Sequence, residues 1–195
     1  MAAEATASPY DLIVVGSGAT GGWVAKRACE AGLRVALVEA GRRSDDTDYR
    51  EHLTASTLPY RGRTQRPLMR TQPQQAQSYA CDEWNSHFFA NDLMEPYPTD
   101  GGAFPWVGRT RLVGGRTNVW GRQSYRFSDL DFKAASHDGV GVDWPLGYAD
   151  LVPYYEIVER YIGVSGQAEG HSILPDGEYL PPMPMTCSER ALRAR

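Results

Sequence analysis

The feature that most restricts the fold is a glycine-rich hexapeptide directly after a short apolar run. The run is Tyr10–Val15, and the hexapeptide at positions 16–21, GSGATG, has the spacing GxGxxG. Residues 19–31 predict a helix that Gly32 can end, and residues 33–39 predict a second apolar strand. Glycines often mark ordinary turns, but this spacing between a strand and a helix indicates a dinucleotide-binding βαβ unit.

The residues of the hexapeptide have distinct expected roles at a pyrophosphate. The first glycine permits the tight turn, the second lets the backbone approach the phosphates, and the third lets the helix pack on the strand. The helix N-terminus adds free N–H donors and a partial positive charge. The residues expected at the cofactor are therefore Gly16, Gly18, Ala19, Thr20 and Gly21. The alternative is a turn between strand and helix that holds no ligand.

An acidic residue, Glu39, ends the second predicted strand. It follows the glycines by roughly 20 residues, where a carboxylate binds the adenosine ribose hydroxyls. A carboxylate there would repel a 2′-phosphate, which argues against NADP. The βαβ unit alone leaves NAD and FAD open. The tripeptide Glu39-Ala40-Gly41 resembles one that is common in flavoproteins, and this resemblance favours FAD, with Ala40 and Gly41 also at the site.

A second glycine-rich segment, LVGGRTNVWG, occupies positions 112–121. Its adjacent glycines, Gly114 and Gly115, would let the backbone approach a flat ring closely. Thr117 and Asn118 could satisfy ring heteroatoms or phosphate oxygens, and Trp120 could stack on a ligand or wall its pocket. The alternative is a Gly-Gly turn followed by a core tryptophan.

The two glycine segments together resemble the glucose–methanol–choline (GMC) oxidoreductase family. The matching stretches are VVGSGATGG with VALVEAGR, then VGGRTNVWGRQSYR, FSDLDFKAA and WPLGYADLVPYYEIVERYIGVSG, in that order. The resemblance is closer to the bacterial branch that acts on sugars and glycosides, including glucoside 3-dehydrogenases and pyranose oxidases. It implies an α/β fold, in which a Rossmann-like FAD-binding βαβ unit belongs to a GMC-type two-domain architecture that is incomplete in this chain.

The resemblance also implies a cofactor and a reaction. FAD would be bound, with residues 114–120 near the isoalloxazine ring. Some relatives attach FAD through a histidine in this loop; Val119 stands at the matching position, so the cofactor is expected to be non-covalent. The implied reaction oxidises a sugar or glycoside hydroxyl, in particular by glycoside 3-oxidation, through hydride transfer to the flavin. Oxygen, a quinone or a cytochrome partner could then reoxidise the flavin.

The family's catalytic base is a histidine near the C-terminus of a much longer chain. The four histidines here, His52, His87, His137 and His171, do not match that motif, so no catalytic residue is expected in this chain. We therefore expect a fragment or one part of a split enzyme, completed by a C-terminal chain or segment; a small subunit or an electron acceptor is a further candidate partner. A catalytically silent nucleotide-binding module is the alternative, and the second glycine segment disfavours an NAD-dependent dehydrogenase.

Four segments are expected along the chain. Residues 1–41 form the FAD-binding βαβ unit, and residues 42–110 form an irregular but ordered, aromatic-rich lid or subunit contact. Residues 111–165 form the flavin-contacting loop and a helix, and residues 166–195 begin the substrate-domain region.

The helix in the third segment is expected over residues 150–162. Asp150 would cap it, Pro153 would lie in its first turn, and Gly163 would end it.

The composition of the chain bears on its binding partners and its cellular location. The net charge is −4 and the 20 basic residues form no run, which disfavours nucleic-acid binding. No apolar run reaches the ~18 residues typical of a membrane span. Three scattered cysteines fit neither a metal site nor a disulfide framework, and a basic leader is lacking, so a cytoplasmic location is expected.

Overall fold

The computed structural model describes residues 9–61, 65–97 and 106–195, and the chain divides into two compact units. The first unit is Met1–Gly121 and holds both glycine-rich segments; the second is Arg122–Arg195. The division falls inside the expected third segment. The second glycine loop and the long helix after it thus belong to different units, and each unit is described by itself.

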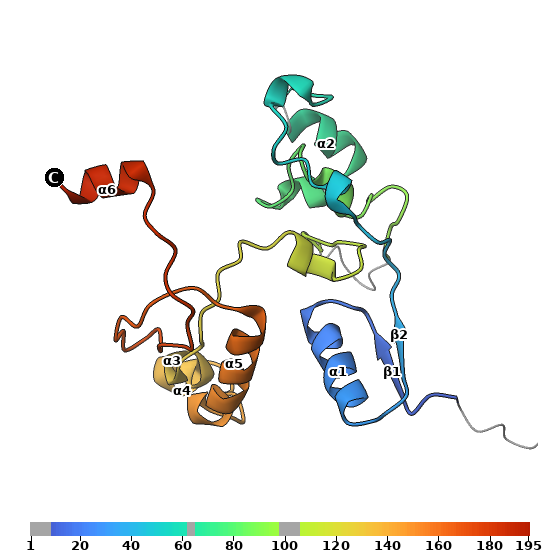
Figure 1. Cartoon of the computed structure of the whole chain (residues 1–195). Coiled ribbons are helices and arrows are strands. Elements are labelled where there is room, and N and C mark those ends of the chain that lie inside the picture. Colours follow the sequence, from blue (N-terminus) through green and yellow to red (C-terminus); the bar gives the residue numbers. More distant parts are fainter. Residues whose placement is uncertain (1–8, 62–64, 98–105) are drawn as a thin grey trace, which may run out of the picture. The chain divides into compact units, whose positions relative to one another are not determined.

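The first unit begins with a strand, a helix and a second strand. These are β1 (Leu12–Val15), α1 (Ala19–Glu30) and β2 (Val35–Val38), and the two strands pair in parallel (Figure 1). In the register, Leu12 lies opposite Val35. The expected βαβ order is confirmed; β1 begins later than expected and ends where expected, and β2 is shorter than expected at both ends. Gly32 follows α1 with a φ of 84°, a left-handed conformation suited to glycine at a helix end.

The helix lies close to the sheet because Gly21 has no side chain. A Cβ at Gly21 would lie 2.0 Å from the carbonyl oxygen of Gly16 and 3.4 Å from Cγ1 of Val14. Val14 of β1 is buried. Any larger residue would push α1 away from β1, as the third glycine of the motif predicts.

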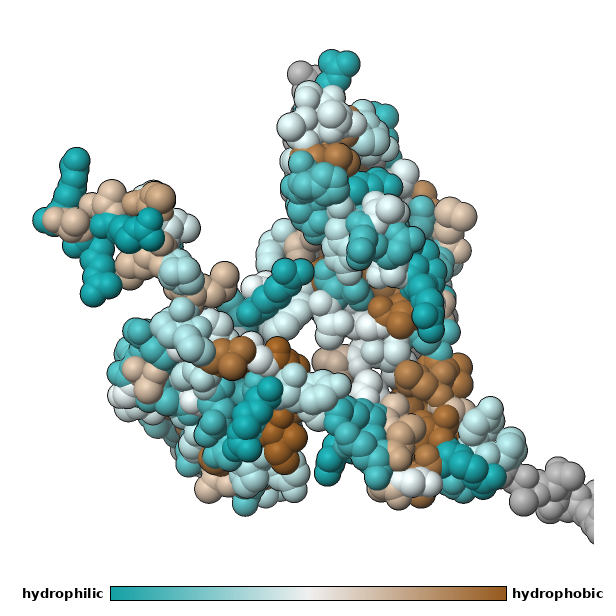
Figure 2. Space-filling view, in the orientation of Figure 1, coloured by the Kyte–Doolittle hydropathy of each residue, from teal (hydrophilic) through white to brown (hydrophobic). Residues whose placement is uncertain are grey.

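Several apolar side chains of the small sheet are exposed in this structure. Ile13 and Val15 of β1 are 62% and 84% exposed, and Leu37 and Val38 of β2 are 44% and 53% exposed. Figure 2 shows hydrophobic surface over these strands. Parallel strands in folded proteins usually have both faces covered. In the described residues only α1 is packed on this sheet through several contacts.

The aromatic-rich segment supplies the buried core of the first unit. Its regular elements are short: η1 (Asp46–Asp48), η2 (Ala55–Thr57), α2 (Gln65–Thr71), η3 (Gln75–Gln77) and η4 (Ser86–Phe88). The core cluster consists of Leu68, Ala76, Cys81, Phe88, Phe89 and Leu112. Single 3₁₀ turns bury these residues without a helical repeat, and the role of the segment as a lid or subunit contact stays a prediction. Residues 62–64 and 98–105 lie outside the described residues.

A buried glutamine joins three parts of this segment. Gln75 is fully buried; its Nε2 donates to Oδ1 of Asp92 and to the carbonyl of Trp106, each at 2.9 Å. Its Oε1 accepts a hydrogen bond from the amide of Arg109 at 2.7 Å. A buried amide with all of these partners fixes the fold of the segment instead of destabilising it.

The second unit is helical. Its elements are α3 (Asp129–Phe132), α4 (Ala134–Asp138), α5 (Tyr148–Ile162) and α6 (Cys187–Arg193). Among the helices of the described residues, none has the length and apolar content to cross a membrane.

Helix α5 begins earlier than the sequence predicted. Gly147 is the N-cap, and Asp150 stands at the third helical position, where its carboxylate accepts a hydrogen bond from the Gly147 amide at 2.8 Å. Asp150 is therefore not the N-cap, and Pro153 lies in the second turn instead of the first. The carboxylate near the helix start stabilises this earlier beginning. Gly163, with a φ of 73°, ends the helix as expected.

Candidate cofactor site

The glycine loop after β1 leaves the start of α1 open. Gly16 has a φ of 90°, which makes the tight turn, and Gly18 is the N-cap of α1 without any side-chain capping bond. The first turn holds no acidic residue, and Ala19 and Thr20 are exposed. An uncapped helix start with small residues and no competing carboxylate suits a phosphate group.

The carboxylate of Glu39 lies against this loop. Its Oε2 accepts hydrogen bonds from the amide of Ser17 at 2.8 Å and from Ser17 Oγ at 2.6 Å. Its Oε1 accepts one from the amide of Gly41 at 2.7 Å. The pKa of Glu39 lies below its ordinary value, mainly because of the Ser17 hydroxyl and then the Ser17 amide, while partial burial opposes the shift. Glu39 is therefore ionised at neutral pH.

Gly41 allows the second glycine segment to reach the first. A Cβ at Gly41 would lie 2.2 Å from the amide nitrogen of Leu112 and 2.4 Å from the carbonyl carbon of Arg111. The next residue, Arg42, forms an isolated parallel bridge with Leu112, and its carbonyl accepts a hydrogen bond from the Val113 amide at 2.9 Å. The close backbone approach requires glycine at position 41.

The second glycine loop is a tight turn that its own polar side chains stabilise through hydrogen bonds. Gly114 and Gly115 have φ values of 88° and 54°, and η5 (Gly115–Asn118) follows. Thr117 Oγ1 donates to the carbonyl of Gly114 at 2.6 Å, and Asn118 Nδ2 donates to that of Gly115 at 2.9 Å. The two polar side chains expected to face a ligand thus bond to the loop backbone.

The two glycine loops touch each other. The amide of Gly114 donates to Ser17 Oγ at 2.9 Å across 97 positions of sequence. A Cβ on Gly115 would lie 3.4 Å from the Cα of Gly18. Ser17 was missing from the expected site because its contact with Gly114 joins segments that are far apart in the sequence; the hydroxyl between the two glycines was the available signal.

The residues after the turn face in different directions. Val119 packs against the core cluster, whereas Trp120 is 43% exposed. Trp120 is thus not part of the core of the described residues. Asn118 Oδ1 accepts a hydrogen bond from Tyr49 Oη at 2.9 Å, and Tyr49 also packs on the core. The loop is therefore anchored both to the glycine loop and to the core.

Comparison with proteins of known function gives several relatives over most of the chain. The fructose dehydrogenase large subunit of Gluconobacter japonicus is 32% identical over 90% of this chain and 31% of its own length. Paromamine 6'-oxidase of Streptomyces fradiae is 29% identical over 94% of this chain and 28% of its own. 6'''-hydroxyparomomycin C oxidase of Streptomyces lividus is 35% identical over 80% of this chain and 23% of its own length.

The chain is homologous to the GMC oxidoreductases. The resemblance found in the glycine segments is thus confirmed over most of the chain, and the homologues oxidise sugar or alcohol hydroxyl groups. The chain spans less than a third of the length of these GMC relatives. No protein-family model matches it.

The four histidines of the chain lie apart from the glycine loops in sequence. His87 is half-buried, with Nε2 2.7 Å from the carbonyl oxygen of Asp48, and burial lowers its pKa. His137 pairs with Asp138 on an exposed surface, and His52 and His171 are exposed. Within the described ranges no group of three metal-ligating side chains is assembled.

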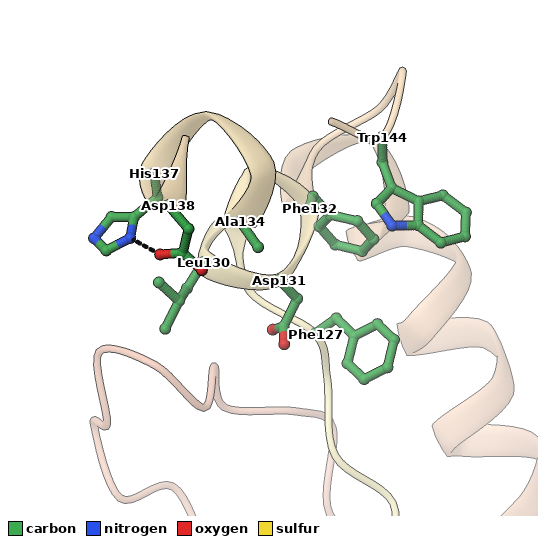
Figure 3. A pocket seen from close by; sticks show the side chains of 8 residues that line it. All are labelled: Phe127, Leu130, Asp131, Phe132, Ala134, His137, Asp138 and Trp144. Carbon is green, nitrogen blue, oxygen red and sulfur yellow. Dashed lines mark hydrogen bonds and ion pairs between the residues drawn. The ribbon is translucent and has the colours of Figure 1, made fainter. Parts of the chain in front are cut away.

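An open hollow in the second unit is a separate feature. It lies at α3, α4 and the segment that leads to α5, and Figure 3 shows the side chains that line it. Its volume is about 520 Å³. It is lined by Phe127, Leu130, Asp131, Phe132, Ala134, His137, Asp138 and Trp144. Asp131 already caps α3 by accepting a hydrogen bond from the Ser128 amide at 2.8 Å. None of the residues expected at the cofactor lines this hollow, so the candidate site remains the meeting point of the glycine loops.

Proposed function

We propose that the chain is the FAD-binding portion of an oxidoreductase that oxidises a hydroxyl group of a sugar or glycoside. The observation that carries the proposal is the meeting of both glycine loops and Glu39 at Ser17 within one compact unit. A turn without a ligand would have no need to bring together two glycine-rich loops and a strand-end carboxylate. The GMC homology supports FAD as the cofactor.

The residues present fit the dinucleotide in distinct ways. The uncapped start of α1, with Ala19 and Thr20, would hold the pyrophosphate through backbone N–H groups. Glu39 would accept hydrogen bonds from the adenosine ribose hydroxyls, with Ala40 and Gly41 beside it. Gly114 and Gly115 would lie near the flavin ring, and the exposed Trp120 would cover one side of it. When bound, FAD supplies the hydride acceptor.

We further propose that the cofactor is held non-covalently. The position that matches the attachment residue of some relatives is Val119, whose side chain has no nucleophile and packs on the core. Within this chain, the affinity would come from the two glycine loops and Glu39.

The proposed substrate class is supported by the names of the relatives, which are enzymes of fructose, paromamine and 6'''-hydroxyparomomycin C. We propose a sugar or glycoside here, with glycoside 3-oxidation as the specific reaction. A further segment or chain would supply the base that accepts the hydroxyl proton. The relative named as a large subunit makes an additional subunit or electron-accepting partner reasonable.

Spectroscopy of the purified native protein tests the proposal. A bound flavin absorbs near ~450 nm, and mass spectrometry of the released cofactor distinguishes FAD from FMN and NAD. Turnover is then assayed with sugars and glycosides and an artificial electron acceptor. We expect bound FAD in this chain, and sugar-dependent reduction of the acceptor once the segment or chain that supplies the base is also present. A colourless protein that does not take up FAD would contradict the proposal, and bound FAD without turnover in the completed enzyme would favour a silent module.

A further inference from the structure

We infer that Ser17 is a positioning residue that locks the second glycine loop to Glu39 and thereby sets the affinity for FAD. The inference rests on the proposed function for its cofactor. We call the lock the two hydrogen bonds of Ser17 Oγ, one donated to Glu39 Oε2 and one accepted from the Gly114 amide. It can be measured without any cofactor.

The direction of each hydrogen bond follows from the charge of Glu39. Because the pKa of Glu39 lies below its ordinary value, the carboxylate carries no proton at neutral pH and acts only as an acceptor. The single hydroxyl proton of Ser17 must then point to Glu39 Oε2, 2.6 Å away. A lone pair of Oγ is left facing the amide of Gly114, which donates at 2.9 Å. The ionised carboxylate thus orients the hydroxyl to receive the second loop.

The loop depends on this contact because its other side-chain bonds are mostly internal. Thr117 and Asn118 bond to the loop's own carbonyl groups, and they fix its shape but not its place. Tyr49 anchors the far side of the turn through Asn118. On the near side, where Gly114 would face the cofactor, the Ser17 hydroxyl holds the loop together with the backbone bond from the Val113 amide to the Arg42 carbonyl. Loss of the hydroxyl leaves the Gly114 amide without this acceptor and leaves Glu39 with one donor fewer.

The lock also explains the choice of residue. Alanine or glycine at position 17 would keep the tight turn but could not bridge a carboxylate and an amide. A hydroxyl both donates and accepts, which this position requires. The bridge couples the carboxylate proposed for the ribose to the loop proposed for the flavin ring, so a change at Ser17 would affect both ends of the cofactor together.

The test compares Ser17→Ala and Ser17→Thr in the native protein. Hydrogen bonds to charged groups are worth enough to change affinity roughly 10- to 100-fold. We expect Ser17→Ala to weaken FAD binding by about that factor, as followed by quenching of flavin fluorescence, and Ser17→Thr, which keeps the hydroxyl, to restore most of it. The matched control is Ser136→Ala, because Ser136 donates similarly to Asp143 at 2.5 Å in the second unit. This control should leave FAD affinity unchanged.

A second readout uses the apoprotein. Hydrogen exchange of the peptide that covers residues 112–121 should become several-fold faster in Ser17→Ala, remain near wild type in Ser17→Thr, and not change in Ser136→Ala. If Ser17→Ala does not fold, Ser17→Cys replaces it, since a thiol is a weak donor and acceptor and should give the same changes.

The possible failures are distinguishable. Unchanged exchange and unchanged FAD affinity in Ser17→Ala would overturn the lock, even in a protein that binds FAD well. Faster exchange without a loss of FAD affinity would overturn the inference that Ser17 sets affinity. A wild-type protein that does not bind FAD would overturn the proposed function and with it the affinity inference, while the exchange experiment would still decide whether the lock exists.

Discussion

Arg126 and Glu159 form a bidentate ion pair in the second unit, with Nε–Oε1 and Nη2–Oε2 distances of 2.8 and 2.6 Å. Their side chains are only 6% and 9% exposed. Arg126 also donates to Tyr148 Oη at 3.0 Å, and Glu159 accepts a hydrogen bond from the Glu178 amide at 2.8 Å. The pair therefore joins the start of the unit to α5 and to the segment after it.

Removal of one partner should destabilise the second unit strongly. Glu159→Ala leaves the Arg126 guanidinium buried without its counter-charge, which typically costs about 3–5 kcal/mol. The matched control is Glu156→Ala, which breaks the exposed pair with Arg160 on the same helix and should cost below about 1 kcal/mol. Thermal or urea unfolding measures both. Equal losses in the two variants would contradict the prediction.

The same pair predicts how stability depends on pH. The hydrogen-bonded Arg126 lowers the pKa of Glu159 below its ordinary value of 4.5, and burial opposes the shift. The stabilisation is complete above the unfolded pKa and is lost as the pH falls through the lower folded pKa. We expect the urea midpoint to fall as the pH is lowered from about 6 to about 3. In Glu159→Gln this dependence should be weaker; an identical pH profile would assign the acid sensitivity to other carboxylates.

Glu39 should control FAD affinity directly. Glu39→Ala is expected to weaken binding by about 1.5–3 kcal/mol, because charge-assisted hydrogen bonds to the ribose are lost. The control is Glu30→Ala at the far end of α1, where the carboxylate pairs with Lys26 on the exposed surface. Titration of the apoprotein with FAD gives both affinities. Wild-type affinity in Glu39→Ala would remove this residue from the site.

A methyl group at Gly41 should separate the two glycine segments. Gly41→Ala places a Cβ 2.2 Å from the Leu112 amide nitrogen, so the backbone must shift, at about 1–3 kcal/mol. Gly22→Ala is the matched control: its Cβ would meet nothing nearer than 3.7 Å, and alanine inside a helix gains about 0.5–1 kcal/mol over glycine. The two variants should change the unfolding temperature in opposite directions. A neutral Gly41→Ala would show that the segments can part freely.

The flavin should be released by denaturation. After acid precipitation, the yellow cofactor is expected in the supernatant, because Val119 offers no atom for a covalent bond. Absorbance of the two fractions measures this. Flavin that stays with the pellet after washing would mean that a different residue forms the attachment.

The sequence predicted the βαβ order because local patterns determine it: a β-branched run, glycine spacing and a glycine at the helix end. It could not predict the role of Ser17, since that role depends on Gly114, 97 positions away. The core of the aromatic-rich segment was also missed, because Phe88 and Leu68 are buried from short turns that show no helical or strand period. The predicted start of α5 was too late in the sequence, because Asp150 stabilises the helix from its third position and is not the N-cap.

Arg42 and Leu112 pair with each other, so the two ends of the stretch between them lie side by side and the stretch forms a closed loop. The entropy lost on closing such a loop grows slowly with length, by about 0.6 kcal/mol for each doubling. Insertions and deletions in this stretch can therefore accumulate over evolutionary time without altering the spacing of the glycine loops. Any replacement must still present apolar side chains to Leu112 and a hydrogen-bond donor to Asn118, as Tyr49 does. A chimaera that exchanges this stretch between homologues and meets both conditions should keep the contact between Ser17 and Gly114.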